Sequence, residues 1–367
     1  MSSPHDQARR VLADGREIIY FDDVGTNRAH DAPDLRELPA TTHHSAMRFD
    51  ALSGEWITIA SHRMTRTHLP SLADCPLCPT SETGTATEIP EVQYDVAVFE
   101  NRFPSFAFGA KTDTNEMRLG LLDRPADGRC EVLCFSSDHT ASVADLPLAR
   151  MKTIISAWIA RTEELSALPG VEQVFCFENR GEEIGVTLRH PHGQIYAYPY
   201  VTPRTEAISI QADKHFQRTG RSLLRDVLDF ERAAGTRVVY SGEHWTAYVP
   251  VAARWPIEIH LAPHRDVPDL PALNTDERAE LAVVYQDLLR RIDHFYPEVD
   301  QVPYIAAWHQ APVRINRHLS RLHLQLFSIL RAPGKLKYLA GSESAMGAWV
   351  NDAVPENVAA RLRELAL

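Results

Sequence analysis

The chain has 367 residues, of which 44% are hydrophobic and 24% charged, so it can bury a large core and divide into about two domains. Its formal net charge of −11 argues against a surface that coats nucleic acid, because such surfaces depend on many Lys and Arg contacts to phosphate. No stretch reaches the roughly 20 uninterrupted apolar residues of a membrane span, and residues 1–10 lack the apolar core of a signal peptide. We therefore expect a cytoplasmic protein with no nucleic-acid or membrane partner.

The chain contains five cysteines, at positions 75, 78, 130, 134 and 176. An odd number argues against a disulfide framework in a cytoplasmic protein. Two of them form a Cys75-x-x-Cys78 pair, whose spacing favours a metal site, with a redox-active pair of the thioredoxin type as the alternative.

The first 45 residues mix charges and prolines without sustained periodicity, which predicts an N-terminal arm with one short strand at 17–21. Short apolar or alternating runs predict further strands at 56–60, 96–99, 131–135, 174–177 and 194–200. Among these runs, apolar residues at helical spacing predict an amphipathic helix over 147–168, with Asp145 as its N-cap. A break at 200–204 suits a domain boundary.

The second half of the chain repeats the order of the first. A predicted strand at 257–261 is followed by His264 and by a helix that starts with a capping-box pattern at Asn274–Glu277. Further on, the His-Leu-Gln-Leu run at 323–326 resembles the His-Gly-Gln-Ile run at 192–195. We infer a degenerate duplication in an α+β protein, with units at 46–203 and 204–367 behind the arm of residues 1–45.

The run His190-Pro191-His192-Gly193-Gln194 is the most informative in the chain. Side chains two apart on a strand share a face, so its three polar side chains are expected to point the same way. A half-exposed strand facing solvent would also explain them. The glycine, which admits a close approach, and the apolar and aromatic neighbours downstream favour a functional site instead.

Several motifs resemble those of the galactose-1-phosphate uridylyltransferases of the histidine-triad superfamily, and they run in one order from about residue 47 to 341. They are Gly54-Glu55-Trp56 with Arg63 and Arg66, Cys75-Pro76-Leu77-Cys78, Cys134 to His139, Phe177 to Gly181 with Gly185, His190 to Gln194, and Trp308 to Pro312. The resemblance implies two tandem histidine-triad-like units whose antiparallel sheet forms a half-barrel flanked by helices.

The resemblance makes His192 the nucleophile that carries UMP in ping-pong transfer from UDP-glucose to galactose-1-phosphate, a step of galactose metabolism by the Leloir pathway. Imidazole suits this role because at neutral pH one ring nitrogen keeps a free lone pair. The proton on the other nitrogen needs an acceptor, and we expect a backbone carbonyl near Gly185. Gln194 is implied as the second catalytic residue, which contacts the phosphate.

Other substrate contacts follow from the resemblance alone. The residues implied are Arg63, Arg66, Leu77, Asn101, Phe103, Asn179, Gly185, Val186, Thr187 and Gln194, with Lys337, Gly341 and Glu343 for the hexose phosphate. Arg102, Ser342 and Gln325 depart from the family pattern, which keeps open a related histidine-dependent adenylyltransferase or nucleotide-sugar phosphorylase. A non-catalytic zinc-binding module is the third alternative. The C-terminal contacts imply a homodimer with shared sites.

Cys75, Cys78, His139 and His190 match the family's zinc ligands residue by residue. Two thiolates and two imidazoles suit one closed, structural zinc site per subunit. Some relatives hold a second metal, for which His309 and His323 match. Because Gln325 replaces a histidine and 202–213 offers no matching glutamate, we expect no second metal and read both histidines as hydrogen-bonding core residues.

Overall fold

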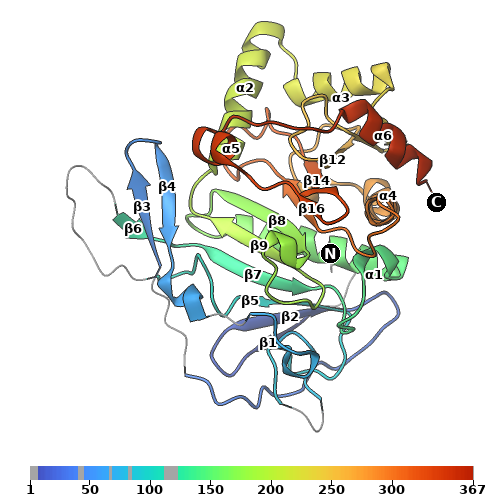
Figure 1. Ribbon diagram of the computed structural model, residues 1–367. Helices are drawn as coiled ribbons and strands as arrows, with labels where there is room; N and C mark the ends of the chain where they lie inside the picture. Colours follow the sequence, from blue (N-terminus) through green and yellow to red (C-terminus); the bar gives the residue numbers. More distant parts are fainter. Residues whose placement is uncertain (1–6, 40–44, 66–67, 82–84, 111–122, 367) are drawn as a thin grey trace.

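The computed structural model describes residues 7–39, 45–65, 68–81, 85–110 and 123–366, and its centre is one 11-stranded antiparallel sheet (Figure 1). In order across the sheet, the strands are β1 (Gln7–Val11), β2 (Glu17–Phe21), β5 (Val96–Glu100), β7 (Arg129–Cys134), β9 (His192–Tyr198), β8 (Gln173–Arg180), β13 (Tyr304–His309), β14 (His323–Ser328), β12 (Ile257–Pro263), β11 (Trp245–Tyr248) and β10 (Val238–Ser241).

Two smaller sheets and six helices are assigned among the described residues. The smaller sheets are β4 (Glu55–Ile59), β3 (Ala46–Asp50) and β6 (Asp123–Pro125), and β15 (Leu330–Ala332) with β16 (Lys335–Leu336). The helices are α1 (Leu148–Ser166), α2 (Pro203–Thr219), α3 (Leu223–Ala234), α4 (Thr275–Asp293), α5 (Gly341–Met346) and α6 (Pro355–Glu364). No helix in the described ranges is long and apolar enough to cross a membrane.

Helices α1 and α4 pack against each other and against the sheet, and they join the two halves of the core. The α1 indole of Trp158 is 2% exposed and packs edge-on against Tyr285 of α4, with ring centroids 5.8 Å apart. Trp158 also lies 6.1 Å from the ring of Trp308 on β13. Such aromatic contacts add to the stabilisation from apolar burial, so this cluster holds the two units as one body.

The strand register confirms the internal duplication. The order β5-β7-β9-β8 in the first half is matched, reading inward from the other side, by β11-β12-β14-β13 in the second. Val132 on β7 lies opposite Gln194 on β9, and His260 on β12 lies opposite Gln325 on β14. The halves meet where β8 pairs with β13. The expected fold class, two tandem units sharing an antiparallel sheet flanked by helices, is confirmed.

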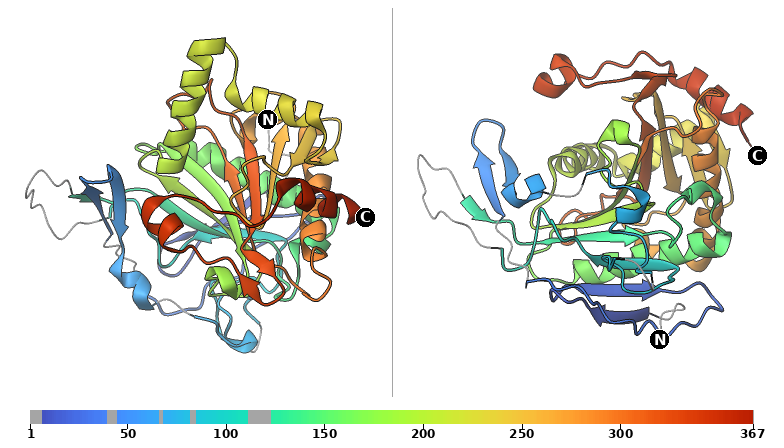
Figure 2. Two further views of the ribbon diagram at one scale, coloured as in Figure 1. Left: turned by 45° about the horizontal axis from the view of Figure 1, so that its top comes forward. Right: turned by 60° about the horizontal axis from the view of Figure 1, so that its bottom comes forward.

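Local features differ from expectation in three places. Helix α1 begins at Leu148 after Pro147, and Asp145 belongs to a preceding 3-10 turn, so its prediction as the N-cap is wrong. The strand expected at 17–21 is present as β2, but a second strand, β1, pairs with it at the edge of the main sheet. Helices α2 and α3 were not predicted and stand together at the C-terminal half of the sheet (Figure 2). The capping box at Asn274 and Glu277 is confirmed.

Candidate active site and metal centre

His192 is the first residue of β9, which lies between β7 and β8 in the middle of the N-terminal half. The next residue, Gly193, must be a glycine for the strand to lie here. A Cβ at Gly193 would be 2.8 Å from Cζ of Phe135 and 3.0 Å from the carbonyl oxygen of Phe177. The absence of a side chain therefore lets the strand that carries His192 sit close to both neighbours.

A hydrogen bond to the backbone two residues earlier sets the tautomer of His192. Nδ1 lies 2.7 Å from the carbonyl oxygen of His190, which can only accept, so Nδ1 carries the proton and Nε2 keeps its lone pair. Burial also lowers the pKa of His192, which keeps the ring neutral. The acceptor for the Nδ1 proton was expected near Gly185. That expectation is wrong, because the acceptor is the carbonyl oxygen of His190, two residues before His192.

Two cavities meet at His192. The Gln194 cavity, of about 240 Å³, is lined by His192 and by most of the residues expected to contact phosphate and nucleoside. Those expected residues are Arg63, Leu77, Asn101, Phe103, Thr187 and Gln194. The Asn179 cavity, of about 310 Å³, is also lined by His192, and it contains the expected Asn179 and Val186. The imidazole thus has access to two different spaces.

Local hydrogen bonds shape the wall of the Gln194 cavity. The side-chain oxygen of Asn101 accepts a 2.8 Å hydrogen bond from the backbone N–H of Phe103, which fixes the turn after β5. The Arg63 guanidinium donates to the carbonyl oxygen of Phe103 at 2.6 Å. These contacts hold a cationic group and an aromatic ring in the same cavity lining as His192.

Not all expected site residues lie at the cavities. Gly185 ends a 3-10 turn in the left-handed conformation, with φ 84°, and is not in either lining. Lys337 and Glu343 form an ion pair of 3.0 Å with each other, near the start of α5 at Gly341, and none of the three lines either cavity in the single chain. Arg66 lies outside the described residues.

The sequence did not indicate several residues of the cavity walls. Glu88 lines the Gln194 cavity and pairs with Arg16, Arg36 and Arg102, from distant segments. In the Asn179 cavity, Glu182, Glu183, Arg189 and Gln301 were also missed. Positions such as Phe99, Val132 and Leu188 could have been found only by extending the alternation of the strands around the histidine motif.

A buried carboxyl group lies on the strand next to that of His192. Glu178 on β8 is opposite Gly193 and accepts hydrogen bonds from the hydroxyls of Tyr304, at 2.7 Å, and Tyr285, at 3.3 Å. Burial raises the pKa of Glu178 to about 7, although the tyrosine hydroxyls and Arg180 oppose the shift. Through these hydrogen bonds, the protonated or partly protonated Glu178 side chain links β8, the neighbour of the His192 strand, to α4 and β13.

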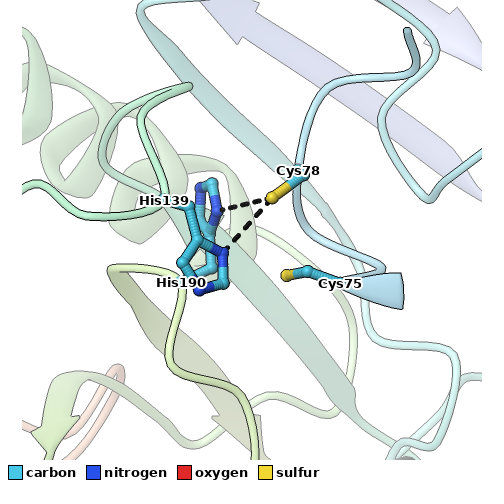
Figure 3. A group of neighbouring side chains, drawn as sticks. All are labelled: Cys75, Cys78, His139 and His190. Carbon is cyan, nitrogen blue, oxygen red and sulfur yellow. Dashed lines mark hydrogen bonds between the residues drawn. The ribbon is translucent and has the colours of Figure 1, made fainter. Parts of the chain in front are cut away.

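The four expected metal ligands come together from three separate segments (Figure 3). The ligand atoms of Cys75, Cys78, His139 and His190 lie within 4.8 Å of one another. The Cys78 sulfur is 3.3 Å from Nδ1 of His139 and 3.6 Å from Nδ1 of His190. In a tetrahedron with Zn–S of about 2.3 Å and Zn–N of about 2.05 Å, a sulfur and a nitrogen are about 3.6 Å apart. The donor set and its spacing therefore fit zinc.

Hydrogen bonds around His190 leave the ring nitrogen that faces Cys78 free to bind a cation. Its Nε2 lies 2.8 Å from the carbonyl oxygen of Ser136, so Nε2 carries the proton and the Nδ1 lone pair faces Cys78. The hydroxyl of Tyr94 lies 3.0 Å from the same Nε2 and donates to the Ser136 carbonyl at 2.8 Å. Burial lowers the pKa of His190 to about 4, which also favours the neutral, metal-binding ring.

The C-terminal histidines are hydrogen-bonded, as expected. Nε2 of His309 lies 3.2 Å from the side-chain oxygen of Gln325, and Nδ1 of His323 lies 3.1 Å from the carbonyl oxygen of Arg321. The amide of Gln325 donates to Glu258 at 2.8 Å. The carboxylate near these histidines is thus on β12, rather than in the stretch 202–213 where a match was sought.

The duplicated sheet, with a histidine opening a central strand in each half and a Cys₂His₂ group behind the first, defines a tandem histidine-triad-like protein. The family model for the N-terminal domain of galactose-1-phosphate uridyl transferase matches residues 36–202, and that for its C-terminal domain matches residues 209–367. The chain therefore belongs to the galactose-1-phosphate uridyl transferase family, and it is an enzyme of the transferase class.

Individual relatives agree with this assignment. The galactose-1-phosphate uridylyltransferase of Streptomyces lividans is 45% identical over 97% of this chain and 96% of its own. That of Thermotoga maritima is 33% identical over 87% of this chain and 98% of its own. A solved uridylyltransferase structure, 30% identical over 87% of this chain and 98% of its own, has a TM-score of 0.77. An ADP-glucose phosphorylase from Arabidopsis thaliana, 20% identical over 88% of this chain and 100% of its own, has a TM-score of 0.65 and shares the fold.

Proposed function

We propose that this chain transfers UMP from UDP-glucose to galactose-1-phosphate by a ping-pong mechanism, through a covalent uridylyl-histidine on His192. One observation carries the proposal: the 2.7 Å hydrogen bond from Nδ1 to His190 leaves the other nitrogen of His192 unprotonated where two cavities meet. Membership of the galactose-1-phosphate uridyl transferase family supports the choice of substrates.

In the first half-reaction, Nε2 of His192 attacks the α-phosphorus of UDP-glucose. A P–N bond forms, the bond to the bridging oxygen breaks, and glucose-1-phosphate leaves with the electron pair of that bond. In the second half-reaction, a phosphate oxygen of galactose-1-phosphate attacks the same phosphorus and the P–N bond breaks. The neutral ring needs no base to remove a proton, because burial lowers its pKa.

Residues of the Gln194 cavity would stabilise the charge on the phosphoryl oxygens. Gln194 follows His192 by two residues on the strand and lines the same cavity, so its amide can donate to the α-phosphate. Arg63 adds positive charge and Thr187 a hydroxyl donor. We assign the nucleoside to Leu77, Asn101 and Phe103 in this cavity, and the hexose side to the Asn179 cavity with Val186. Gly185 lines neither cavity, and we propose that it contacts substrate only when substrate is bound.

We assign one structural zinc ion to Cys75, Cys78, His139 and His190. A bound ion would cross-link the three segments that carry these residues. It would take part in no chemical step, because protein atoms would fill all four tetrahedral positions. We also propose a cytoplasmic homodimer in which Lys337, Gly341 and Glu343, which line neither cavity of their own chain, complete the neighbouring subunit's site. The domain boundary at 203–204 remains part of the same proposal.

The test is to incubate the protein with UDP-glucose labelled at the α-phosphate and to look for acid-labile label on the protein. We expect label on the wild type, none on His192→Ala, and unchanged zinc content in both, since His192 is not a predicted ligand. His323→Gln, which alters the duplicate histidine, is the matched control and should keep the label. Persistence of label in His192→Ala would show that the nucleophile is wrongly assigned.

The identities of base and acceptor need a second measurement, because Arg102 lines the Gln194 cavity where the family pattern has an acidic residue. UDP-glucose and ADP-glucose are each supplied with galactose-1-phosphate or with inorganic phosphate. We expect turnover with UDP-glucose and galactose-1-phosphate. Faster turnover of ADP-glucose would favour the adenylyltransferase, and release of a nucleoside diphosphate with inorganic phosphate would favour the phosphorylase.

A further inference from the structure

A third cavity lies in the C-terminal half of the sheet, and the duplication relates it to the Gln194 cavity. This Arg321 cavity has a volume of about 280 Å³, compared with about 240 Å³ for the Gln194 cavity. It is lined by residues of β11, β12 and the start of β14 on one side and by residues of α2 and α3 on the other. It is therefore as large as the space that we assign to a nucleoside in the first half.

The register shows that the two cavities occupy equivalent positions. In the first half, Phe99 pairs with Val132, and both line the Gln194 cavity. In the second half, Tyr248 pairs with His260 at the same places in the strand order, and both line the Arg321 cavity. The segment that follows β5 in one half and β11 in the other also contributes to each lining.

The histidine at the edge of the Arg321 cavity repeats the arrangement of the nucleophile. Nδ1 of His323 lies 3.1 Å from the carbonyl oxygen of Arg321, two residues earlier, as Nδ1 of His192 lies 2.7 Å from that of His190. A backbone carbonyl oxygen can only accept, so Nδ1 of His323 carries the proton and Nε2 keeps its lone pair, as in His192. The second half has thus kept both the cavity and the orientation of its histidine.

We propose that the Arg321 cavity binds a small organic phosphate with an aromatic or other apolar part, such as a nucleoside monophosphate, at a site separate from His192. Arg321 is 3% exposed, and its Nε has no hydrogen-bond partner in the described part of the chain. Its other nitrogens donate to the carbonyl of Pro263 and pair with Asp266 at 2.7 Å. An anion in the cavity would satisfy the remaining donor.

The charges around the cavity favour an anion over a cation. Arg204 and Arg254 add further donors to the wall. Its two acidic residues already have partners: Glu231 pairs with Arg237 at 2.9 Å, and Glu258 accepts from the backbone N–H of Arg254 at 2.6 Å and lies 3.1 Å from His260. Burial lowers the pKa of Arg321 to about 10, so the folded protein bears a cost for this charge that a bound phosphate would offset.

The rest of the lining is apolar, which favours an organic ligand over a free inorganic ion. Ile208 on α2, Leu224 and Val227 on α3, and Tyr248 and Leu322 on the sheet face the same space. A pocket with mostly apolar walls and a few converging polar groups is the usual form of a small-molecule site. The polar end at Arg321 and the apolar remainder together match a phosphate joined to a base or another ring.

Isothermal titration calorimetry with UMP, AMP, ribose 5-phosphate, inorganic phosphate and uridine tests the proposal. We expect at least one phosphate to bind at two equivalents per chain in the wild type. Val227→Trp, which fills the mouth of the cavity at a residue 37% exposed, should leave one equivalent. Arg254→Leu should weaken the second site about tenfold, the loss expected for one hydrogen bond to a charged group. Val283→Trp, at an exposed valine on α4, is the matched control and should keep both.

Two results would overturn the proposal. One is a single equivalent in the wild type for every phosphate tested, or a second equivalent that neither Val227→Trp nor Arg254→Leu changes. The other is uridine binding as tightly as UMP at the second site, because Arg321 would then have no part in recognition. Labelling of His192 is measured in each variant and should be unchanged, which separates this proposal from the proposed reaction.

Discussion

Gly193→Ala tests whether close packing beneath β9 positions the nucleophile. The added methyl would lie 2.8 Å from Cζ of Phe135, whereas unstrained carbon atoms are about 3.7 Å apart, so the ring would have to move by about 0.9 Å. Trp158, whose ring centroid is 6.3 Å from that of Phe135, resists this movement of the ring. The added methyl would also lie 3.0 Å from the carbonyl oxygen of Phe177 on the neighbouring strand. Strand β9 must therefore shift instead.

The expected costs follow from that shift. Overpacking of this kind lowers the free energy of unfolding by about 1–3 kcal/mol. A displacement near 1 Å at a reacting group can lower the rate by about 100-fold, so we expect kcat to fall by about 10- to 100-fold. Urea unfolding and steady-state turnover measure the two effects. Gly341→Ala is the control for stability, because its methyl meets no atom within 4 Å. Unchanged stability and turnover in Gly193→Ala would refute the reasoning.

Three further predictions concern the metal centre and the buried carboxyl. Tyr94→Phe removes the hydroxyl that contacts His190 and Ser136, and we expect about tenfold weaker zinc binding in a chelator competition. Removing the metal with a chelator should lower the melting temperature of the wild type, and Cys75→Ser should already melt at that lower temperature without chelator. If untreated Cys75→Ser retained zinc and melted at the same temperature as the untreated wild type, the ligand set would be wrong. Because the folded pKa of Glu178 is raised from 4.5 to about 7, its contribution to stability is complete below pH 4.5 and is lost as the pH rises to about 7. The loss amounts to about 3 kcal/mol, and urea unfolding from pH 4.5 to 8 should show it in the wild type but not in Glu178→Gln.

The parts of the structure that depend on strong local patterns could be predicted from the sequence. Alternating and helical periodicities located the central strands and α1, and the capping box located the start of α4. The repeated histidine run indicated the duplication, because two copies of one pattern at similar spacing require two similar units. The proximity of Cys75 and His190 could be expected only through the family resemblance, since 115 residues separate them.

Features that depend on distant partners could not be predicted. Glu88 enters the wall of the Gln194 cavity because it pairs with Arg16 and Arg36, and nothing in its own segment indicates those partners. The acceptor for His192 depends on how its ring turns relative to the backbone, which periodicity does not describe. Asp145 is not the N-cap because it is the last residue of a 3-10 turn, and the extended Leu146 and Pro147 lie between it and α1.

His190 performs two tasks with different atoms. Its ring belongs to the cation-binding group, while its carbonyl oxygen holds the proton of His192 through a bond of 2.7 Å. Pro191 lies between His190 and His192, and its ring fixes φ, so the backbone between the two histidines has little freedom to move. Under the proposed function, a zinc ion held at this site would therefore fix the tautomer of His192 without taking part in the chemistry. Specific activity should then vary between preparations in proportion to their metal occupancy, even when all of them are folded.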